Sequence, residues 1–299
     1  MNHVVKGGCV KRAAKLLSSI LLFIFLFISF DFISVSTLEN QSVTVELKKL
    51  EKDQIMVSFI PLEIGEATLI QLENNDFYLI DTGYTETAED LVAILQDHGV
   101  AQLKGLFLTN PFPEHFGGFP FITEYFPIET IYLPVLTANT FQIPNHLKAK
   151  IKQLKANDRV NLLNNVNIYV LSPFEPLSLS PQANSMVLQL VDNDISFLFT
   201  SDIDSETENK LLNKYNLKSE ILKVSDFGSN SASAPEFIVE VDAQVAIIFS
   251  GNPELNGLSD DVLERLHESW IDVFILKRIG EVQIISDGTD YSISVVKDE

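Results

Sequence analysis

Residues 109–118, Thr-Asn-Pro-Phe-Pro-Glu-His-Phe-Gly-Gly, hold the side chains best suited to chemistry in this chain. Glu114 and His115 are adjacent there, and carboxylate and imidazole groups are ligands that suit a divalent ion such as Zn²⁺. An apolar run before the segment, residues 105–108, predicts a buried strand, and Gly117-Gly118 predicts a turn after it. The segment therefore favours metal chemistry.

Other catalytic motifs do not replace this one. The sequence contains no G-x-S-x-G elbow, no phosphate-binding P-loop and no G-x-G-x-x-G fingerprint. Cys9 is the single cysteine and lies near the N-terminus, so the folded part needs no disulfide. Serine chemistry at Ser229 would need a base nearby, and Phe227, two residues before it, is not a base. Serine and cysteine nucleophiles are therefore excluded.

Hydrophobic periodicity indicates the elements that position residues 109–118. Three β-rich runs, at 55–61, 67–72 and 77–81, predict a meander, and apolar spacing predicts a helix over 87–98. Further strands are expected at 106–109, 166–171, 186–190, 195–200, 220–224 and 245–249, and near Val273, Val282 and Ile293; helices are expected at 205–214, 234–241 and 259–268. Both halves combine meanders with alternating strands and helices. This pattern predicts an α/β fold with two facing sheets and helices outside, a four-layer αββα sandwich.

The first 40 residues differ in composition from the rest. Four basic residues precede an apolar or small-residue run over 16–30, which is the layout of a secretory signal peptide or an N-terminal membrane anchor. The small residues at 34–36 would suit cleavage, so cleavage and retention both stay open. We expect residues 41–299 to form one domain, either extracellular or anchored to the outer face of the cytoplasmic membrane.

The charge balance restricts the partners. The chain has 21 basic and 41 acidic residues and a net charge of −20. A field of that sign repels phosphate backbones, so binding to nucleic acid is disfavoured.

Eight short blocks resemble, in order, those of the metallo-β-lactamase superfamily, and within it the extracytoplasmic hydrolase domain of ComEC-type DNA-uptake proteins. The blocks lie at 57–60, 65–67, 79–83, 109–118, 184–185, 197–202, 222–229 and 262–266. This resemblance implies the metallo-β-lactamase fold for residues 41–299. It also implies a two-metal hydrolase, whose motif reads T-H-x-H-x-D-H-x-G-G where this chain has residues 109–118.

Most of the ligand positions implied by the resemblance have changed. Those that have lost a ligand in this chain are Asn110, Phe112, Phe227 and Leu258. The residues that could still form a residual metal site are Glu114, His115, Asp202 and Asp226. Three carboxylates and one imidazole would suit one ion of Zn²⁺, Mn²⁺, Mg²⁺ or Ca²⁺.

Structural roles are the alternative for single residues of this set. Asp202 precedes an expected helix and could cap its N-terminus, and Asp81, before Thr-Gly, could stabilise a turn. His115, next to Phe116, could be a hydrogen-bonded and partly buried histidine.

We therefore expect a catalytically inactive protein with a degenerate metal site, which binds or scaffolds a cell-surface protein or a small ligand in the former active-site cleft. No cofactor is expected beyond at most one divalent metal ion. The alternative is a metal-dependent phosphodiesterase or nuclease-type hydrolase with a single-metal centre.

Overall fold

The central strands of both sheets are buried on both faces, which explains their almost continuous apolar sequence. The computed structural model describes residues 49–251 and 257–297, which lie in one compact unit, Leu47–Glu299. In β3, Tyr78 and Ile80 point into one hydrophobic cluster while Phe77 and Leu79 point into another. The side-chain period of two thus places apolar groups on both sides of the sheet.

The first sheet has eight strands in the order β15-β14-β1-β2-β3-β4-β5-β6. Its strands are β1 (Ile55–Phe59), β2 (Thr68–Leu72), β3 (Phe77–Ile80), β4 (Leu103–Phe107), β5 (Ile128–Pro134), β6 (Ile151–Leu154), β14 (Glu281–Ser286) and β15 (Tyr291–Val296). The strands from β15 to β3 pair antiparallel, whereas β3 to β6 pair parallel.

The second sheet has seven strands in the order β13-β12-β11-β10-β9-β8-β7. Its strands are β7 (Arg159–Leu163), β8 (Val166–Ser172), β9 (Val187–Asp192), β10 (Ile195–Phe199), β11 (Ile221–Lys223), β12 (Val245–Ile248) and β13 (Asp272–Ile275). Here β7 to β10 form an antiparallel meander, and β10 to β13 are parallel.

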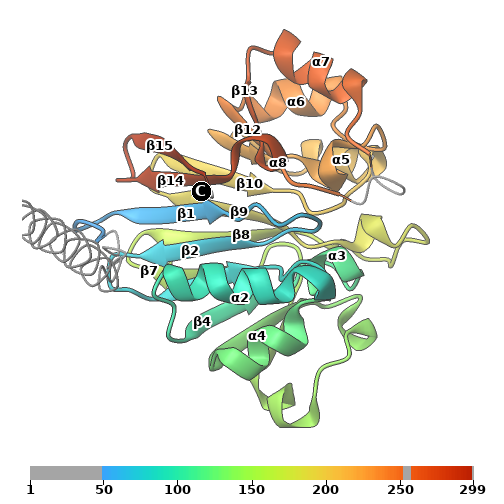
Figure 1. The fold of residues 1–299 in the computed structure, drawn as a ribbon. Helices are drawn as coiled ribbons and strands as arrows, with labels where there is room; N and C mark the ends of the chain where they lie inside the picture. Colours follow the sequence, from blue (N-terminus) through green and yellow to red (C-terminus); the bar gives the residue numbers. More distant parts are fainter. Residues whose placement is uncertain (1–48, 252–256, 298–299) are drawn as a thin grey trace, which may run out of the picture. The chain divides into compact units, whose positions relative to one another are not determined.

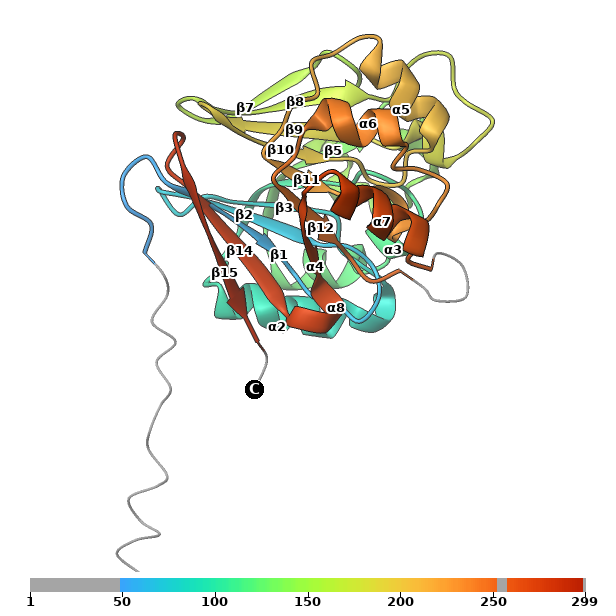
Figure 2. The same ribbon diagram turned by 90° about the horizontal axis from the view of Figure 1, so that it is seen from above.

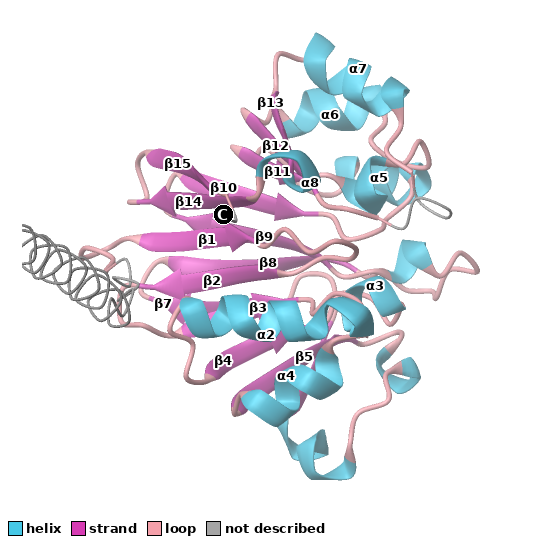
Figure 3. Cartoon of the chain, in the orientation of Figure 1, coloured by secondary structure: helices cyan, strands magenta, loops and turns pink. Residues whose placement is uncertain are grey.

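Helices lie on the outer faces of both sheets (Figures 1 and 3). The α-helices are α2 (Ala88–Asp97), α3 (Pro113–Phe116), α4 (Phe119–Tyr125), α5 (Ser205–Leu212), α6 (Pro235–Val241), α7 (Asp260–Glu268) and α8 (Leu276–Ile279). Short 3₁₀ turns are η1 (Thr85–Thr87), η2 (Ala138–Thr140), η3 (Asn145–Lys150), η4 (Gln182–Asn184) and η5 (Ser225–Gly228). Helices α2 and α4 pack on the first sheet, and α5, α6 and α7 on the second. The view from above shows the same separation (Figure 2).

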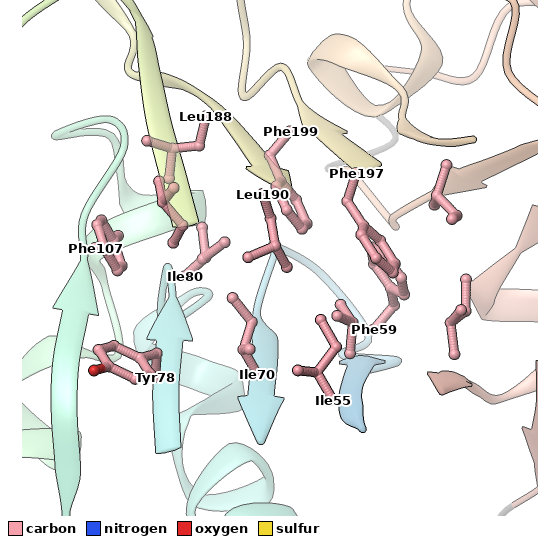
Figure 4. Close-up of a cluster of buried hydrophobic side chains, with 14 of the residues drawn as sticks. Ile55, Phe59, Ile70, Tyr78, Ile80, Phe107, Leu188, Leu190, Phe197 and Phe199 are labelled. Carbon is pink, nitrogen blue, oxygen red and sulfur yellow. The ribbon is translucent and has the colours of Figure 1, made fainter. Parts of the chain in front are cut away.

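The main core lies between the two sheets. Figure 4 shows Ile70 and Ile80 of the first sheet facing Leu188, Leu190 and the strand β10 of the second. The four layers confirm the predicted αββα sandwich, because each sheet buries one face against the other sheet and one against helices.

The predicted helices over 87–98, 205–214, 234–241 and 259–268 are α2, α5, α6 and α7, within two residues at each end. The strand predicted at 106–109 begins earlier, at Leu103, as β4. Strands β5, β6 and β7 and the short helices α3, α4 and α8 were not predicted. Strand β6 is short and half exposed, so its sequence signal is weak. In contrast, β5 is largely buried and β7 alternates between exposed and buried residues, and both patterns are typical of strands.

The predicted signal peptide or membrane anchor, residues 1–40, lies outside the described residues. Within residues 49–251 and 257–297, every helix is too short or too polar to cross a membrane.

Candidate functional site

The candidate site forms where strands from both sheets end. Asp81 directly follows β3, and Thr109 comes two residues after β4; in the second sheet Asp202 follows β10, and Lys223 is the last residue of β11. Strands β3 and β4 are parallel, and so are β10 and β11. Because the carboxyl ends of parallel strands meet at one edge, residues distant in sequence converge there.

His115 lies at the centre of this site, on the short helix α3. Its carbonyl oxygen accepts hydrogen bonds from the backbone N–H of Thr82 at 2.7 Å and from the hydroxyl of Thr82 at 3.0 Å. Gly118 permits this close packing, because a Cβ there would lie 2.1 Å from the carbonyl oxygen of Thr82. The Gly-Gly pair that follows the motif is therefore needed to bring α3 against the end of β3.

The imidazole of His115 joins the two sheets through carboxylates. Its Nδ1 lies 2.8 Å from Oδ2 of Asp81 in the first sheet, and its Nε2 lies 2.8 Å from Oδ2 of Asp202 in the second. The His115 side chain is fully buried, and Asp81 and Asp202 are almost fully buried. Thr109 fixes Asp81 by donating its backbone N–H and its hydroxyl to the two carboxylate oxygens, at 2.7 and 2.6 Å.

A second charged bridge lies next to the first. The ammonium of Lys223, in the second sheet, forms an ion pair with Oε1 of Glu66, which precedes β2 in the first sheet. Lys223 also donates to the carbonyl oxygen of Ser201 at 3.0 Å. Oε2 of Glu66 lies 3.7 Å from Nδ1 of His115, so the two bridges form one buried network.

The charges in the network shift one another's pKa values. Burial lowers the pKa of His115, but Asp202, Asp81 and Glu66 raise it more, and the net result is well above its ordinary value. For Glu66, burial raises the pKa to about 7 although Lys223 and His115 lower it. Burial also raises the pKa of Asp202, yet the opposing effect of His115 leaves it below its ordinary range. The raised pKa of His115 and the lowered pKa of Asp202 both favour a protonated imidazole between ionised carboxylates.

An aromatic ring closes the site from the second sheet. Phe227 is 1% exposed, and its ring centroid lies 6.0 Å from that of His115 and 5.7 Å from Nζ of Lys223. The backbone that places it is strained, since Asp226 and Phe227 have φ of 46° and 53°. Ser201 and Asp81, also at strand ends, have φ of 48° and 60°. Left-handed conformations in non-glycine residues cost roughly 1–3 kcal/mol each and concentrate at functional sites.

The structure brings together two of the four predicted metal ligands. Among the described residues, potential ligand atoms of Glu66, His115 and Asp202 lie within 4.8 Å of one another. Glu114 and Asp226 do not join this group. The carboxylate of Asp226 instead accepts the hydroxyls of Ser229 and Ser231, and its pKa is raised chiefly by burial. The side chain of Glu114 is partly exposed.

Purely structural roles were the alternative for Asp202, Asp81 and His115, and the structure differs from one residue to the next. Asp202 does not cap helix α5; Asp204 does, accepting a hydrogen bond from the backbone N–H of Thr207 at 2.9 Å. Asp81 is more than a turn stabiliser, because it binds His115 directly. His115 is hydrogen-bonded through both ring nitrogens, as the alternative expected, but it is fully buried instead of partly buried.

The altered motif positions are used for packing and for local hydrogen bonds. Asn110 is fully buried, donates to Oγ of Ser185 at 2.9 Å and accepts from the backbone N–H of Phe112 at 3.0 Å. Phe112 itself is only partly buried, unlike Phe227. Leu258 packs at the rim, where a Cβ on Gly228 would meet its Cδ1 at 2.5 Å.

Glu66 and Lys223 were not predicted as site residues. For Lys223 a signal was present, since it is a charged residue inside the apolar run at 221–224. A charged side chain at a position of buried character is usually paired.

These contacts do not fit a metal centre of the kind implied by the resemblance. A ligating imidazole needs one free nitrogen, but both nitrogens of His115 are bound to carboxylates. Glu66 is bound to an ammonium, and Phe227 lies where a ligand would be required. One observation favours an ion: Oδ1 of Asp202 is buried and has no hydrogen-bond partner among the described residues.

The fold agrees with that of solved metallo-β-lactamase-type proteins. The metallo-β-lactamase fold protein YhfI from Bacillus subtilis matches 75% of this chain and 96% of its own, with a TM-score of 0.53 and 14% identity. CmlA, a diiron β-hydroxylase from Streptomyces venezuelae, matches 73% of this chain and 52% of its own, with a TM-score of 0.52 and 10% identity. The chain therefore has the metallo-β-lactamase αββα fold.

Sequence comparison finds similarity to a smaller group of proteins, which are competence proteins. ComE operon protein 3 from Bacillus subtilis is 26% identical over 201 residues, 64% of this chain, and competence protein ComA from Neisseria gonorrhoeae is 28% identical over 190 residues, 62% of this chain. The aligned part spans only 26% of each relative. No family model matches the chain. The chain thus resembles part of the ComEC-type competence proteins, as its sequence blocks predicted.

Proposed function

We propose that this chain is a catalytically inactive relative of the ComEC-type hydrolase domain. In this proposal it acts as a binding or scaffolding protein, extracellular or anchored to the outer face of the cytoplasmic membrane. The likeness to competence proteins supports the family level of the proposal.

The observation that carries the proposal is the bridge Asp81–His115–Asp202. Catalysis by a metal hydrolase needs a metal ion with an open coordination position for water or substrate. Here the imidazole contacts both carboxylates at 2.8 Å, which leaves no nitrogen for an ion. His115 is also inaccessible to a substrate from outside.

Burial of the site also bears on the partner. Glu66, His115 and Asp202 are each at most 5% exposed, so a ligand in the former cleft would not contact them. We therefore favour as partner a cell-surface protein that binds to the solvent-exposed surface of this chain. A small ligand in contact with Glu66, His115 and Asp202 is disfavoured. The net charge of −20 argues against nucleic acid as the partner.

Two measurements on the purified protein test the proposal. Elemental analysis should find well under one zinc ion per chain, and hydrolysis of a generic phosphodiester should stay at the level of a mock preparation when Mn²⁺ or Mg²⁺ is added. Two tightly held ions per chain, or metal-stimulated turnover that Asp202→Ala abolishes, would overturn it.

A single-metal phosphodiesterase or nuclease-type hydrolase is the second candidate, and one observation favours it. The unpaired Oδ1 of Asp202 lies in the group with Glu66 and His115 whose ligand atoms are within 4.8 Å. One divalent ion could displace the direct contacts and act as a Lewis acid. Metal-stimulated hydrolysis lost in both Asp202→Ala and Glu66→Gln would favour this candidate.

A further inference from the structure

Lys223 brings a positive charge into the one group of potential metal ligands among the described residues. Its side chain is 2% exposed and reaches Glu66 from the opposite sheet. Glu66 belongs, with His115 and Asp202, to the group whose ligand atoms lie within 4.8 Å of one another. An ammonium is a compact point charge, and it interacts with carboxylates in the same way as a small cation does.

The surroundings of Lys223 hold the ammonium in place. It donates to the carbonyl oxygen of Ser201 at 3.0 Å, and the rings of Phe227 and Phe249 lie 5.7 and 6.0 Å from Nζ. A carboxylate, a carbonyl oxygen and aromatic faces all attract a cation. This arrangement fixes the charge within the buried space between the two sheets.

The charge balance of the group explains why a cation is needed. Glu66, Asp81 and Asp202 contribute carboxylates, while His115 and Lys223 are the basic groups in contact with them. Burying a carboxylate without a compensating positive charge is strongly unfavourable. If Lys223 lost its ammonium, Glu66 would lose its direct ion pair, and His115 would be the one basic group left beside three carboxylates.

We infer that Lys223 is a tethered cation that takes the place of a divalent ion at Glu66, His115 and Asp202, so that Lys223→Met converts this group into a divalent-metal site. Two carboxylates and one imidazole are suitable ligands for Mn²⁺ or Zn²⁺, and an ion bound there would displace the direct contact between Nε2 of His115 and Asp202. The inference rests on the proposed absence of a metal ion from the wild-type site. It adds the ammonium of Lys223 to the Asp81–His115–Asp202 bridge as a second cause of that absence.

Titration with Mn²⁺ alone tests the inference on four proteins. These are the wild type, Lys223→Met, the double variant Glu66→Gln/Lys223→Met and the control Lys218→Met, which removes an exposed lysine paired with Asp242. Binding is measured by electron paramagnetic resonance of free Mn²⁺, and stability by the thermal midpoint.

Lys223→Met should bind one Mn²⁺ per chain. Its midpoint should rise by about 5–10 °C when free Mn²⁺ is a hundredfold above the dissociation constant. The wild type and Lys218→Met should show no rise. The double variant should bind Mn²⁺ at least about tenfold more weakly than Lys223→Met, because one ligand is lost.

Other results would overturn the inference. These are no Mn²⁺ binding by Lys223→Met, or a double variant that binds as tightly as the single one. If Lys223→Met does not fold without metal, the fraction of folded protein after refolding is measured in place of the thermal midpoint. Refolding only in the presence of Mn²⁺ supports the inference. Failure to refold with Mn²⁺ contradicts it. Stoichiometric Mn²⁺ in the wild type would instead refute the proposed function, so the two failures are distinguishable.

Discussion

Among the described residues, two histidines contact carboxylates, and they do so in different surroundings. His115 is fully buried and lies between Asp81 and Asp202, one from each sheet. His98, at the end of α2, has a single carboxylate partner, Glu281 of β14, at 2.9 Å, and both side chains are about a tenth exposed. The distances are nearly equal, so contact geometry does not separate the two sites.

The two sites differ in the number of other charged groups that lie near each histidine and its carboxylate partners. For Glu281, burial raises the pKa, but hydrogen bonds from His98 and Gln283 leave it below its ordinary range. The pKa of His115 depends on Asp202, Asp81 and Glu66. The pKa of Glu66 depends in turn on Lys223. The His98–Glu281 pair therefore fastens a helix to one strand, whereas the network around His115 couples charged groups of both sheets at the candidate site.

Removing His115 should give the largest effect. His115→Gln leaves buried carboxylates without their counter-charge, and we expect a loss of about 3–5 kcal/mol in unfolding free energy. Urea denaturation at pH 7 measures it. A loss below about 1 kcal/mol would show that the network does not hold the two sheets together.

Returning a histidine to position 227 should cost less. Phe227→His replaces a buried ring by a polar one, and we expect about 1–3 kcal/mol of destabilisation from lost apolar burial and an unsatisfied nitrogen. Phe112→His is the matched control, because Phe112 is only partly buried. Equal effects of the two substitutions on the urea midpoint would contradict the assigned difference in packing.

The contribution of His115 should depend on pH. Because its pKa is raised in the folded state, its stabilising effect is complete below the unfolded value of about 6.5 and is lost as pH rises through the folded value. The difference in unfolding free energy between wild type and His115→Gln should therefore shrink from pH 6 to pH 9. A difference that grows over this range would mean that the imidazole is neutral in the native state.

Removing His98 should give the smallest effect. His98→Gln breaks one hydrogen bond at the periphery, where Gln283 still donates to Glu281, so we expect a loss of about 1 kcal/mol. The same urea assay applies. A loss as large as that for His115→Gln would remove the distinction between the two histidines.

The sequence predicted the fold well because it encodes burial directly. Continuous apolar runs such as β1 and β10 mark strands with two covered faces, and the amphipathic spacing of α2 marks a helix. Strands β5 and β6 were not predicted, and their parallel pairing, of β5 with β4 and of β6 with β5, depends on contacts that no local pattern reports.

The site was predicted only in part, for a related reason. His115 and Asp202 lie in motifs whose order along the chain is recognisable. Glu66 and Lys223 become partners only when the two sheets pack face to face, and their atoms then meet across more than 150 residues of sequence. Local sequence cannot show that a charged residue of one sheet is neutralised by the other.

The left-handed residues at the strand ends have a practical consequence for protein engineering. Asp81, Ser201, Asp226 and Phe227 hold unfavourable backbone angles while the imidazole and ammonium of the chain itself occupy the centre. A main chain already held at these angles is a template on which designers could place histidines at positions 110, 112, 226 and 227.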